Sequence, residues 1–270
     1  MRIRVATLMV CSALLLAPPA LAQYGAGFSS RATGETYNVE LGGFLWYPTP
    51  DVVISSEGLG LIGSQISLVD DLQMEKHWTR QLRVVLRPGT KHKFRFEYTP
   101  IKYENEDAVL RRELVFNGIR FPVAIPVDAE VIWRAFRFGY EWDFVYRDRG
   151  FVGLLLDVKY TDVEATLSNL IDTEFVRARA PIPAIGFIGR GYILPNVAIT
   201  GEFSFFKLPE DVDEDYGGKY FDLDIYGTVN FNDHVGVQGG YRSFDVFYKI
   251  EDDEGDLQLK GIYLGAVVRF

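Results

Sequence analysis

Apolar and polar residues alternate along most of this chain, in segments of ten or more residues separated by turn-forming clusters. A period of two is that of a β-strand, whose successive side chains point to opposite faces. The clearest segment, 132–146, has one parity that is wholly aromatic and another that is small or charged. The aromatic parity consists of Phe136, Phe138, Tyr140, Trp142, Phe144 and Tyr146, and the other of Ala135, Arg137, Gly139, Glu141, Asp143 and Val145.

The same polarity recurs in segments 92–104, 150–166 and 219–231. One lipid-facing parity and one lumen-facing parity are typical of a transmembrane β-barrel. A soluble sandwich or lipocalin-like barrel would instead turn its apolar face inward. The recurrence, with glycine and both signs of charge opposite the aromatics, favours the membrane barrel. No segment after residue 22 approaches the ~20 consecutive apolar residues of a helical span.

Connections of two lengths order the strands. Four are short, at 87–90, 147–150, 194–196 and 232–234, and the others are long or acidic, notably 47–79, 105–128 and 209–218. Barrels of this kind place short turns in the periplasm and long loops outside. The sequence therefore predicts an all-β, antiparallel up-and-down barrel of about ten strands. These are 36–46, 79–88, 92–104, 129–146, 150–166, 174–193, 196–208, 219–231, 235–250 and 256–270.

Two regions leave alternatives open. Residues 59–68 would add a strand pair in a twelve-stranded alternative, and the prolines and glycines of 174–193 blur the alternation there. The Asn117-Gly118 pair lies between two short apolar runs, as in a hairpin with a type I′ turn. We expect an extracellular ribbon that continues the barrel wall.

The N-terminus has the features of a secretory signal peptide. Arg2 and Arg4 precede an apolar run, and Ala20-Leu21-Ala22 forms a small-residue cleavage site. We expect a signal at 1–22, a periplasmic segment at 23–35 and the barrel at 36–270. Removing the signal leaves 26 of the 28 basic residues against 37 acidic ones, a formal charge of −11. So acidic a chain is an unlikely partner for nucleic acid.

The last strand carries a recognisable pattern. Its residues Tyr263, Gly265, Val268 and Phe270 resemble the terminal assembly signal of bacterial outer-membrane proteins. The resemblance implies insertion by the barrel-assembly machinery into the outer membrane of a Gram-negative-type bacterium. Arg87-Pro88-Gly89, the stretch 68–72 and Gly239-Gly240-Tyr241-Arg242 are similar to a family of small, largely uncharacterised outer-membrane barrels. That similarity implies the fold and no chemistry.

The predicted lumen face contains charges of both signs in near-equal numbers. Nine are basic: Arg83, Arg87, Lys93, Arg95, Arg137, Lys159, Arg177, Arg179 and Arg269. Eight are acidic: Glu40, Glu97, Glu141, Asp143, Asp157, Glu202, Asp222 and Asp224. Charges shielded from water require partners, so we expect pairing across a narrow, nearly closed lumen. The core of this network is expected to be Arg95, Glu97, Arg137, Glu141, Asp143, Asp157, Lys159, Glu202, Asp222 and Asp224.

Candidate chemistry is sparse. His92 and His234 lie in predicted turns, where structural roles are usual. His77 lies beside Trp78, near Asp70 and Asp71 and downstream of Ser64 and Ser67. A loop-borne acid, histidine and serine could serve a surface hydrolase or lipid-modifying enzyme, although no motif fixes their geometry. An exposed histidine at the membrane interface is the plainer interpretation.

Acidic loops provide the only candidate cation sites. Asp211, Asp213 and Asp215 faintly resemble a calcium loop, but Tyr216 and Asp222 stand where that loop requires glycine and glutamate. Residues 251–254 form a second acidic cluster. We expect at most weak divalent-cation binding near lipopolysaccharide phosphates, and neither a cofactor motif nor a paired-cysteine metal site appears. The sequence thus favours a non-enzymatic outer-membrane barrel, structural or a narrow channel, in contact with outer-membrane lipid and lipopolysaccharide.

Overall fold

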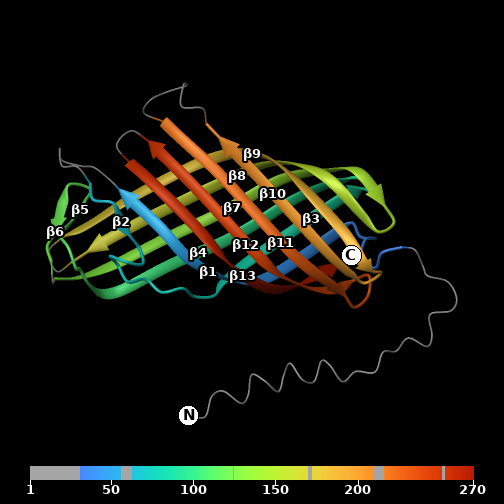
Figure 1. Cartoon of the computed structure of the whole chain (residues 1–270), viewed down its shortest axis with the longest axis horizontal. Coiled ribbons are helices and arrows are strands. Elements are labelled where there is room, and N and C mark those ends of the chain that lie inside the picture. Colours follow the sequence, from blue (N-terminus) through green and yellow to red (C-terminus); the bar gives the residue numbers. More distant parts are fainter. Residues whose placement is uncertain (1–30, 56–62, 124, 170–171, 209–215, 251–252) are drawn as a thin grey trace, which may run out of the picture. The chain divides into compact units, whose positions relative to one another are not determined.

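A computed structural model describes residues 31–55, 63–123, 125–169, 172–208, 216–250 and 253–270. Its main feature is a closed barrel of ten antiparallel strands (Figure 1). The barrel closes because β13 (Asp253–Arg269) pairs with β1 (Val39–Ser55). The intervening strands are β3 (Thr79–Gly89), β4 (His92–Val109), β7 (Pro126–Arg147), β8 (Gly150–Ser168), β9 (Thr173–Leu194), β10 (Val197–Lys207), β11 (Tyr216–Asn230) and β12 (Val235–Ile250).

The expected ten-stranded, up-and-down barrel is confirmed. Among the described residues of the region of the twelve-stranded alternative, 63–68, the strand present is β2 (Ile66–Ser67), which pairs with β1 at Val53 and Ile54. In the described part of the chain no helix is long and apolar enough to cross a membrane. The four short connections lie at one end of the barrel with Phe270, here called the turn end, and the long connections lie at the other, the loop end (Figure 1).

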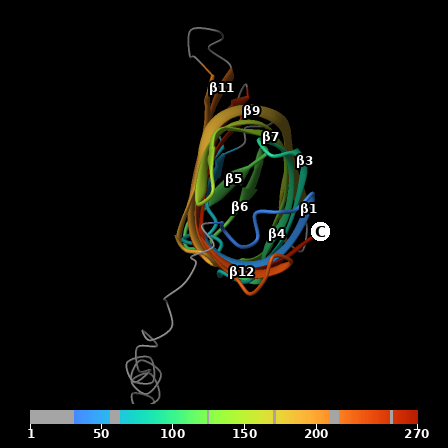
Figure 2. The ribbon, with the colours of Figure 1, turned by 90° about the vertical axis from the view of Figure 1, so that its right-hand side faces the viewer.

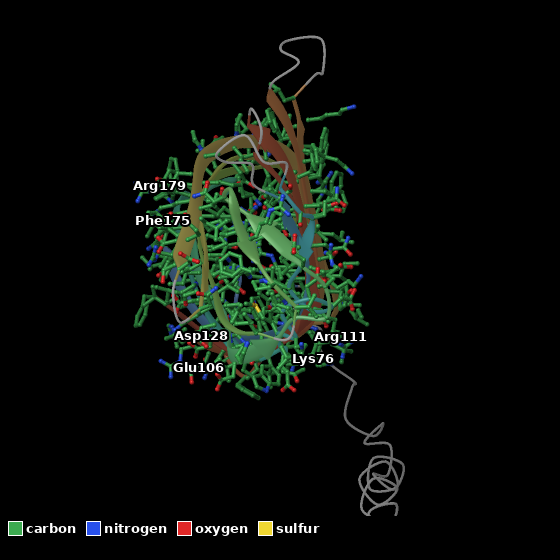
Figure 3. The ribbon with its side chains drawn as sticks, turned by 90° about the vertical axis from the view of Figure 1, so that its left-hand side faces the viewer. Lys76, Glu106, Arg111, Asp128, Phe175 and Arg179 are labelled. Carbon is green, nitrogen blue, oxygen red and sulfur yellow. The ribbon has the colours of Figure 1, made fainter. Side chains whose placement is uncertain are left out.

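The predicted ribbon at Asn117-Gly118 forms, but its expected position is wrong. Strands β5 (Leu114–Phe116) and β6 (Ile119–Phe121) make a separate two-stranded sheet, and Asn117 and Gly118 have the positive φ angles of a type I′ turn. Figure 3 shows this hairpin inside the ring of barrel strands at the loop end. Because Leu114, Phe116 and Phe121 are buried, the hairpin fills the mouth of the barrel instead of extending its wall.

Strand polarity inverts along the barrel axis. Toward the turn end of β7 the outward residues include Phe138 and Trp142, and Arg137 and Glu141 point inward. Toward the loop end the outward positions become Arg134 and Glu130, and the buried inward ones become Trp133 and Val131. The outer wall therefore has an apolar band near the turn end and a polar sector near the loop end. The interior has the reverse arrangement.

One register irregularity changes a predicted orientation. The β7–β8 ladder shifts between Trp142 and Val145, so Phe144 and Val145 are both exposed. Such a bulge places two residues opposite one and reverses the alternation beyond it. Tyr146, expected on the lipid face, instead packs with the buried Phe151 and lies 5.2 Å from the Arg87 guanidinium.

The segment before β1 crosses the turn-end opening of the barrel (Figure 2). The Ala32 amide donates to the Asp148 carbonyl in the β7–β8 turn, and the Thr33 amide to Pro195 in the β9–β10 turn. The Gly34 amide donates to the Asp233 carboxylate in the β11–β12 turn. Residues 31–38 thereby connect these three turns and act as a strap across this end. The expected signal peptide, 1–22, and residues 23–30 lie outside the described residues.

Candidate functional site: the charged lumen

Glu97 is the centre of an ion-pair network inside the barrel. Its carboxylate lies 3.0 Å from Arg83 Nε, 3.3 Å from Arg137 and Arg242, and 3.6 Å from Arg95. These arginines come from β3, β7, β12 and β4, so one carboxylate connects strands on opposite sides of the barrel. All five side chains are buried. A charge removed from water is costly unless an opposite charge neutralises it. The cluster therefore stabilises these walls only while every member is present.

Glu141, Asp143 and Glu202 extend the network toward the turn end and across the lumen. Lys93 Nζ lies 2.5 Å from Glu141 and 2.9 Å from Asp143. Arg95 connects Glu141, at 3.1 Å, to Glu202, at 2.8 Å. Glu202 also accepts from Arg137 at 2.7 Å. The inward side of β4, β7 and β10 is therefore one continuous set of ion pairs.

The network continues to β8 and β11 through Asp157, Lys159 and Asp222. Arg137 lies 2.9 Å from Asp157, and Lys159 Nζ lies 2.7 Å from Asp222. Arg242 makes two hydrogen bonds to Asp222, at 3.0 and 2.7 Å. Bidentate arginine–carboxylate pairs of this kind fix orientation as well as charge.

A second cluster of charged and hydrogen-bonded side chains lies at the turn end of the lumen. Glu35, in the strap, accepts from Arg190 and from the Tyr192 hydroxyl, both at 2.9 Å. Arg87 donates to the Glu35 carbonyl and lies 3.7 Å from its carboxylate. Arg269 pairs with Glu40 at 2.5 Å. The strap, which is not part of the barrel wall, thus supplies one of the buried charges, Glu35.

Charge balances within the described lumen. Nine basic side chains are buried there: Arg83, Arg87, Lys93, Arg95, Arg137, Lys159, Arg190, Arg242 and Arg269. Nine acidic ones accompany them: Glu35, Glu40, Glu97, Glu141, Asp143, Asp157, Glu202, Asp222 and Asp224. A lumen in which opposite charges neutralise one another offers no surplus of either sign to attract a permeant ion.

The structure brings together all ten residues expected at the core of the network, the tenth being Asp224, which lies 3.3 Å from Arg83. The prediction was wrong for two other expected lumen residues, Arg177 and Arg179. Both lie on the outer face of β9, where with Arg134 they surround Asp162, and Figure 3 shows Arg179 on the outside of the wall. They lie in the loop-end sector of inverted polarity, where an outward charge meets solvent. The sequence prediction had extended the turn-end polarity along the whole strand.

Three network residues were missed by sequence reasoning: Glu35, Arg190 and Arg242. Arg242 shares its inward parity with Phe244 and Val246, because β12 also passes into the apolar loop-end interior. Arg190 follows a glycine-rich stretch in which alternation is weak. Glu35 precedes the first strand, so no alternation could reveal it. Only for Arg242 was a signal present, since Gln238 and Arg242 share one parity.

An apolar plug fills the lumen beyond the charged network. Inward wall residues such as Trp46 and Trp133 pack in one cluster with loop residues that include Leu68, Leu72 and Leu114. Leu68, Leu72 and Leu114 have no exposed surface. The loop that carries Leu68 and Leu72 is held by Arg112, which lies 2.7 Å from the Asp71 carboxylate. The hydrogen bonds that Arg112 donates to the Asp71 carboxylate lower the pKa of Asp71.

The loop around His77 uses its polar groups in local structure. Asp71 accepts from Arg112 and from the Ser67 amide, while the Ser67 hydroxyl accepts from the Asp70 amide. The Ser64 hydroxyl accepts from the Val115 amide. The His77 ring lies edge-on to Tyr103, with centroids 5.0 Å apart. In the described contacts, therefore, the serine and aspartate of the hydrolase alternative are engaged elsewhere.

The other candidate residues have these positions. The His92 ring is 2.6 Å from the Tyr140 hydroxyl, and His234 lies 3.1 Å from the Arg269 carbonyl. Asp211, Asp213, Asp215 and residues 251–252 lie outside the described residues. Among the residues that are described, no group of three or more His, Cys, Asp or Glu side chains is placed to hold a metal ion.

The residues of the terminal signal pattern lie at the seam of the barrel. Tyr263 points inward and donates to Asp224 at 2.9 Å, whereas Val268 and Phe270 are exposed on the outer wall. Gly265 faces Phe44 across the β1–β13 pair. A Cβ at Gly265 would lie 2.3 Å from the Gly43 carbonyl oxygen and from the Phe44 ring. The glycine therefore permits close approach of the first and last strands.

Comparison with known proteins places the fold and no more. No protein-family profile and no curated protein matches the sequence. The outer-membrane protease OmpT of Escherichia coli matches in structure with a TM-score of 0.59 and 9% identity, over 92% of this chain and 99% of that chain. Ail, the attachment invasion locus protein of Yersinia pestis, gives 0.38 at 10% identity, over 86% and 99%. A FadL homologue of Pseudomonas aeruginosa gives 0.39 at 6%, over 86% and 90%. The likeness to OmpT shows a shared barrel fold, and the two weaker likenesses carry no argument.

Proposed function

We propose that this protein is an integral outer-membrane barrel with a closed lumen, a structural or surface-presenting barrel that conducts no solute. The observation that carries the proposal is the succession of three sets of buried contacts along the interior. The strap and its Glu35 cluster close the turn end, the ion-pair network centred on Glu97 fills the middle, and the apolar plug fills the loop end. An open channel would need a path through all three.

The outer wall supports a position in a bilayer. Exposed apolar side chains cover it on every side of the band near the turn end, including Phe94, Phe138, Leu156, Phe187, Ile225 and Leu264. Soluble proteins rarely expose a continuous apolar surface of this extent, whereas lipid-facing barrel walls consist of one. The polar outer sector above the band then extends into the external solvent, and export would use the N-terminal signal at 1–22.

A non-enzymatic role is favoured by the contacts of the His77 loop. The Ser64, Ser67 and Asp71 side chains stabilise the loop and its attachment to the hairpin. A nucleophile and its base need to lie within hydrogen-bond reach of each other. The His77→Ala variant is accordingly expected to retain whatever activity a preparation shows.

Conductance measurement tests the proposal. The purified full-length protein, inserted into a planar lipid bilayer, is expected to give no stable conductance steps at any moderate voltage. A porin prepared by the same method serves as the positive control for insertion. Heat-modifiable electrophoretic mobility verifies that the barrel is folded. Large, stable steps from the folded protein would overturn the closed lumen.

A further inference from the structure

The outer wall contains a groove in its otherwise smooth apolar band. It lies over β12, β13, β1, β3 and β4 and has a volume of about 950 Å³. Gly43 lines the groove, and a Cβ built there would have no atom within 4 Å, so a larger side chain has room to enter it. The exposed side chains of Leu45, Leu82 and Leu264 border it.

Register explains why the groove exists. Gly43 pairs with Leu82 on β3 and with Ala266 on β13. A glycine and an alanine thus stand side by side among leucines on the same outward face. The small residues remove side-chain volume from one row of the wall, and the leucines in the neighbouring rows remain. Lipid chains are the apolar groups available to fill such a space at this depth.

Basic groups lie at the loop-end edge of the groove. Arg80 pairs with Leu45 in the β1–β3 ladder, is exposed, and lines the groove. Lys76 Nζ lies 5.3 Å from the Tyr47 ring centroid, and the Trp78 ring is tilted by 36° against the Tyr47 ring with centroids 4.8 Å apart. Among the described residues neither Arg80 nor Lys76 forms an ion pair, unlike the charges inside the barrel.

This edge has the features of a membrane interface. Trp78 is 53% exposed beside Tyr47, and tryptophan and tyrosine concentrate at the level of lipid headgroups. A guanidinium binds a phosphate through parallel hydrogen bonds, and an ammonium binds it as a point charge. The apolar groove below and the two cations above therefore match the two parts of one amphiphile.

We propose that this groove binds one anionic lipid of the outer leaflet, with an acyl chain over Gly43 and a phosphate-bearing headgroup at Arg80 and Lys76. The inference rests on the proposed membrane position and not on closure of the lumen. It also gives a role to the Lys76-His77-Trp78 segment that requires no catalysis: Lys76 and Trp78 face the lipid, while His77 packs against Tyr103.

Two variants remove the two halves of the site separately. Gly43→Leu adds a side chain that enters the groove, and Arg80→Gln removes the charge at its edge without changing the strand. Gly201→Leu is the matched control, because Gly201 shares the outward parity of Ile199 and Phe203 on β10 and also has no atom within 4 Å of a built Cβ. All four proteins are checked for folding by heat-modifiable mobility.

The probe is phosphatidic acid mixed into phosphatidylcholine bicelles, and native mass spectrometry measures the lipid that each barrel retains. We expect the natural protein and Gly201→Leu to retain one phosphatidic acid in preference to phosphatidylcholine. Gly43→Leu and Arg80→Gln are expected to retain it at least tenfold less.

Several results would overturn the site. These are equal retention of both lipids by the natural protein, retention by Gly43→Leu and Arg80→Gln equal to that of the control, or a dimer of the chain covering the groove. If Gly43→Leu does not fold, Arg80→Gln with Lys76→Gln decides the question, because both side chains are outside the packed interior. A conducting barrel that still retained the lipid would contradict the closed lumen and leave the site intact.

Discussion

At the level of single residues, Glu97 shows why a buried charge is useful only within its network. The four arginines around it come from four strands. In water an ion pair of this length contributes little, but here none of the partners can be solvated if the carboxylate is lost. The network therefore favours one relative position of the barrel walls over any other.

Glu97→Gln is expected to lower the free energy of unfolding by about 3–5 kcal/mol, the usual cost of removing one partner from a buried ion pair. Urea unfolding followed by intrinsic fluorescence measures the change. Glu104→Gln provides the comparison, because the Lys102–Glu104 pair lies half-exposed on the outer wall and its loss is expected to change stability far less than the loss of Glu97. Equal effects of the two substitutions would contradict the role assigned to Glu97.

Gly265→Ala tests the close approach at the barrel seam. The added methyl group would meet the Gly43 carbonyl oxygen and the Phe44 ring, each at 2.3 Å. Overpacking of this kind costs about 1–3 kcal/mol, and we expect a lower yield of folded barrel in refolding assays. Gly201→Ala, in open space, should fold like the natural protein. If the two variants fold equally well, close packing at Gly265 is not what the seam requires.

At the level of elements, the loop 63–78 and the β5–β6 hairpin depend on each other. Arg112 connects them, since it bonds to Asp71 and to the Gln65 carbonyl. Their apolar side chains share one cluster with the inward wall residues. Neither segment buries its apolar face alone, so we expect them to detach together.

Acid should loosen this attachment. Arg112 holds the pKa of Asp71 below its ordinary value of 3.8. A carboxylate whose pKa is lower in the folded state stabilises that state above the ordinary value, and the contribution is lost as pH falls through the lowered pKa. Protease cleavage in 63–78 is therefore expected to rise below about pH 4. Arg112→Gln should be cleaved more readily at neutral pH and show a smaller further rise. A parallel pH dependence in both proteins would show that another group titrates.

For the whole molecule, we expect the three proposed closures of the lumen to act independently. Replacing residues 111–123 by a short Gly-Ser linker removes the hairpin and exposes the apolar wall around Trp133, but leaves the Glu97 network intact. We expect bilayer recordings of this variant to remain without porin-like steps. Stable conductance after loss of the hairpin alone would show that the plug, and not the charged network, closes the barrel.

The alternation of residues determined the strands, their number and the existence of a charged lumen. The predicted and observed strand bounds differ chiefly at the loop end, where polarity inverts. One example is the predicted strand 92–104, which is observed as His92–Val109. A period of two depends only on the local backbone, so it survives in the sequence wherever the two faces differ. The pairing of opposite charges likewise follows from their near-equal numbers on one parity.

Other features depended on contacts between distant segments. The sequence alone could not show that Glu35 enters the lumen, that the hairpin at Asn117 folds inward, or that Arg177 and Arg179 lie outside, because each depends on what surrounds the wall at a given height. Nor could it show the groove at Gly43, which arises only when β13 and β3 bring Ala266 and Leu82 beside it. Local periodicity specifies which faces of a strand differ, whereas closure of the barrel decides which face meets lipid, solvent or charge.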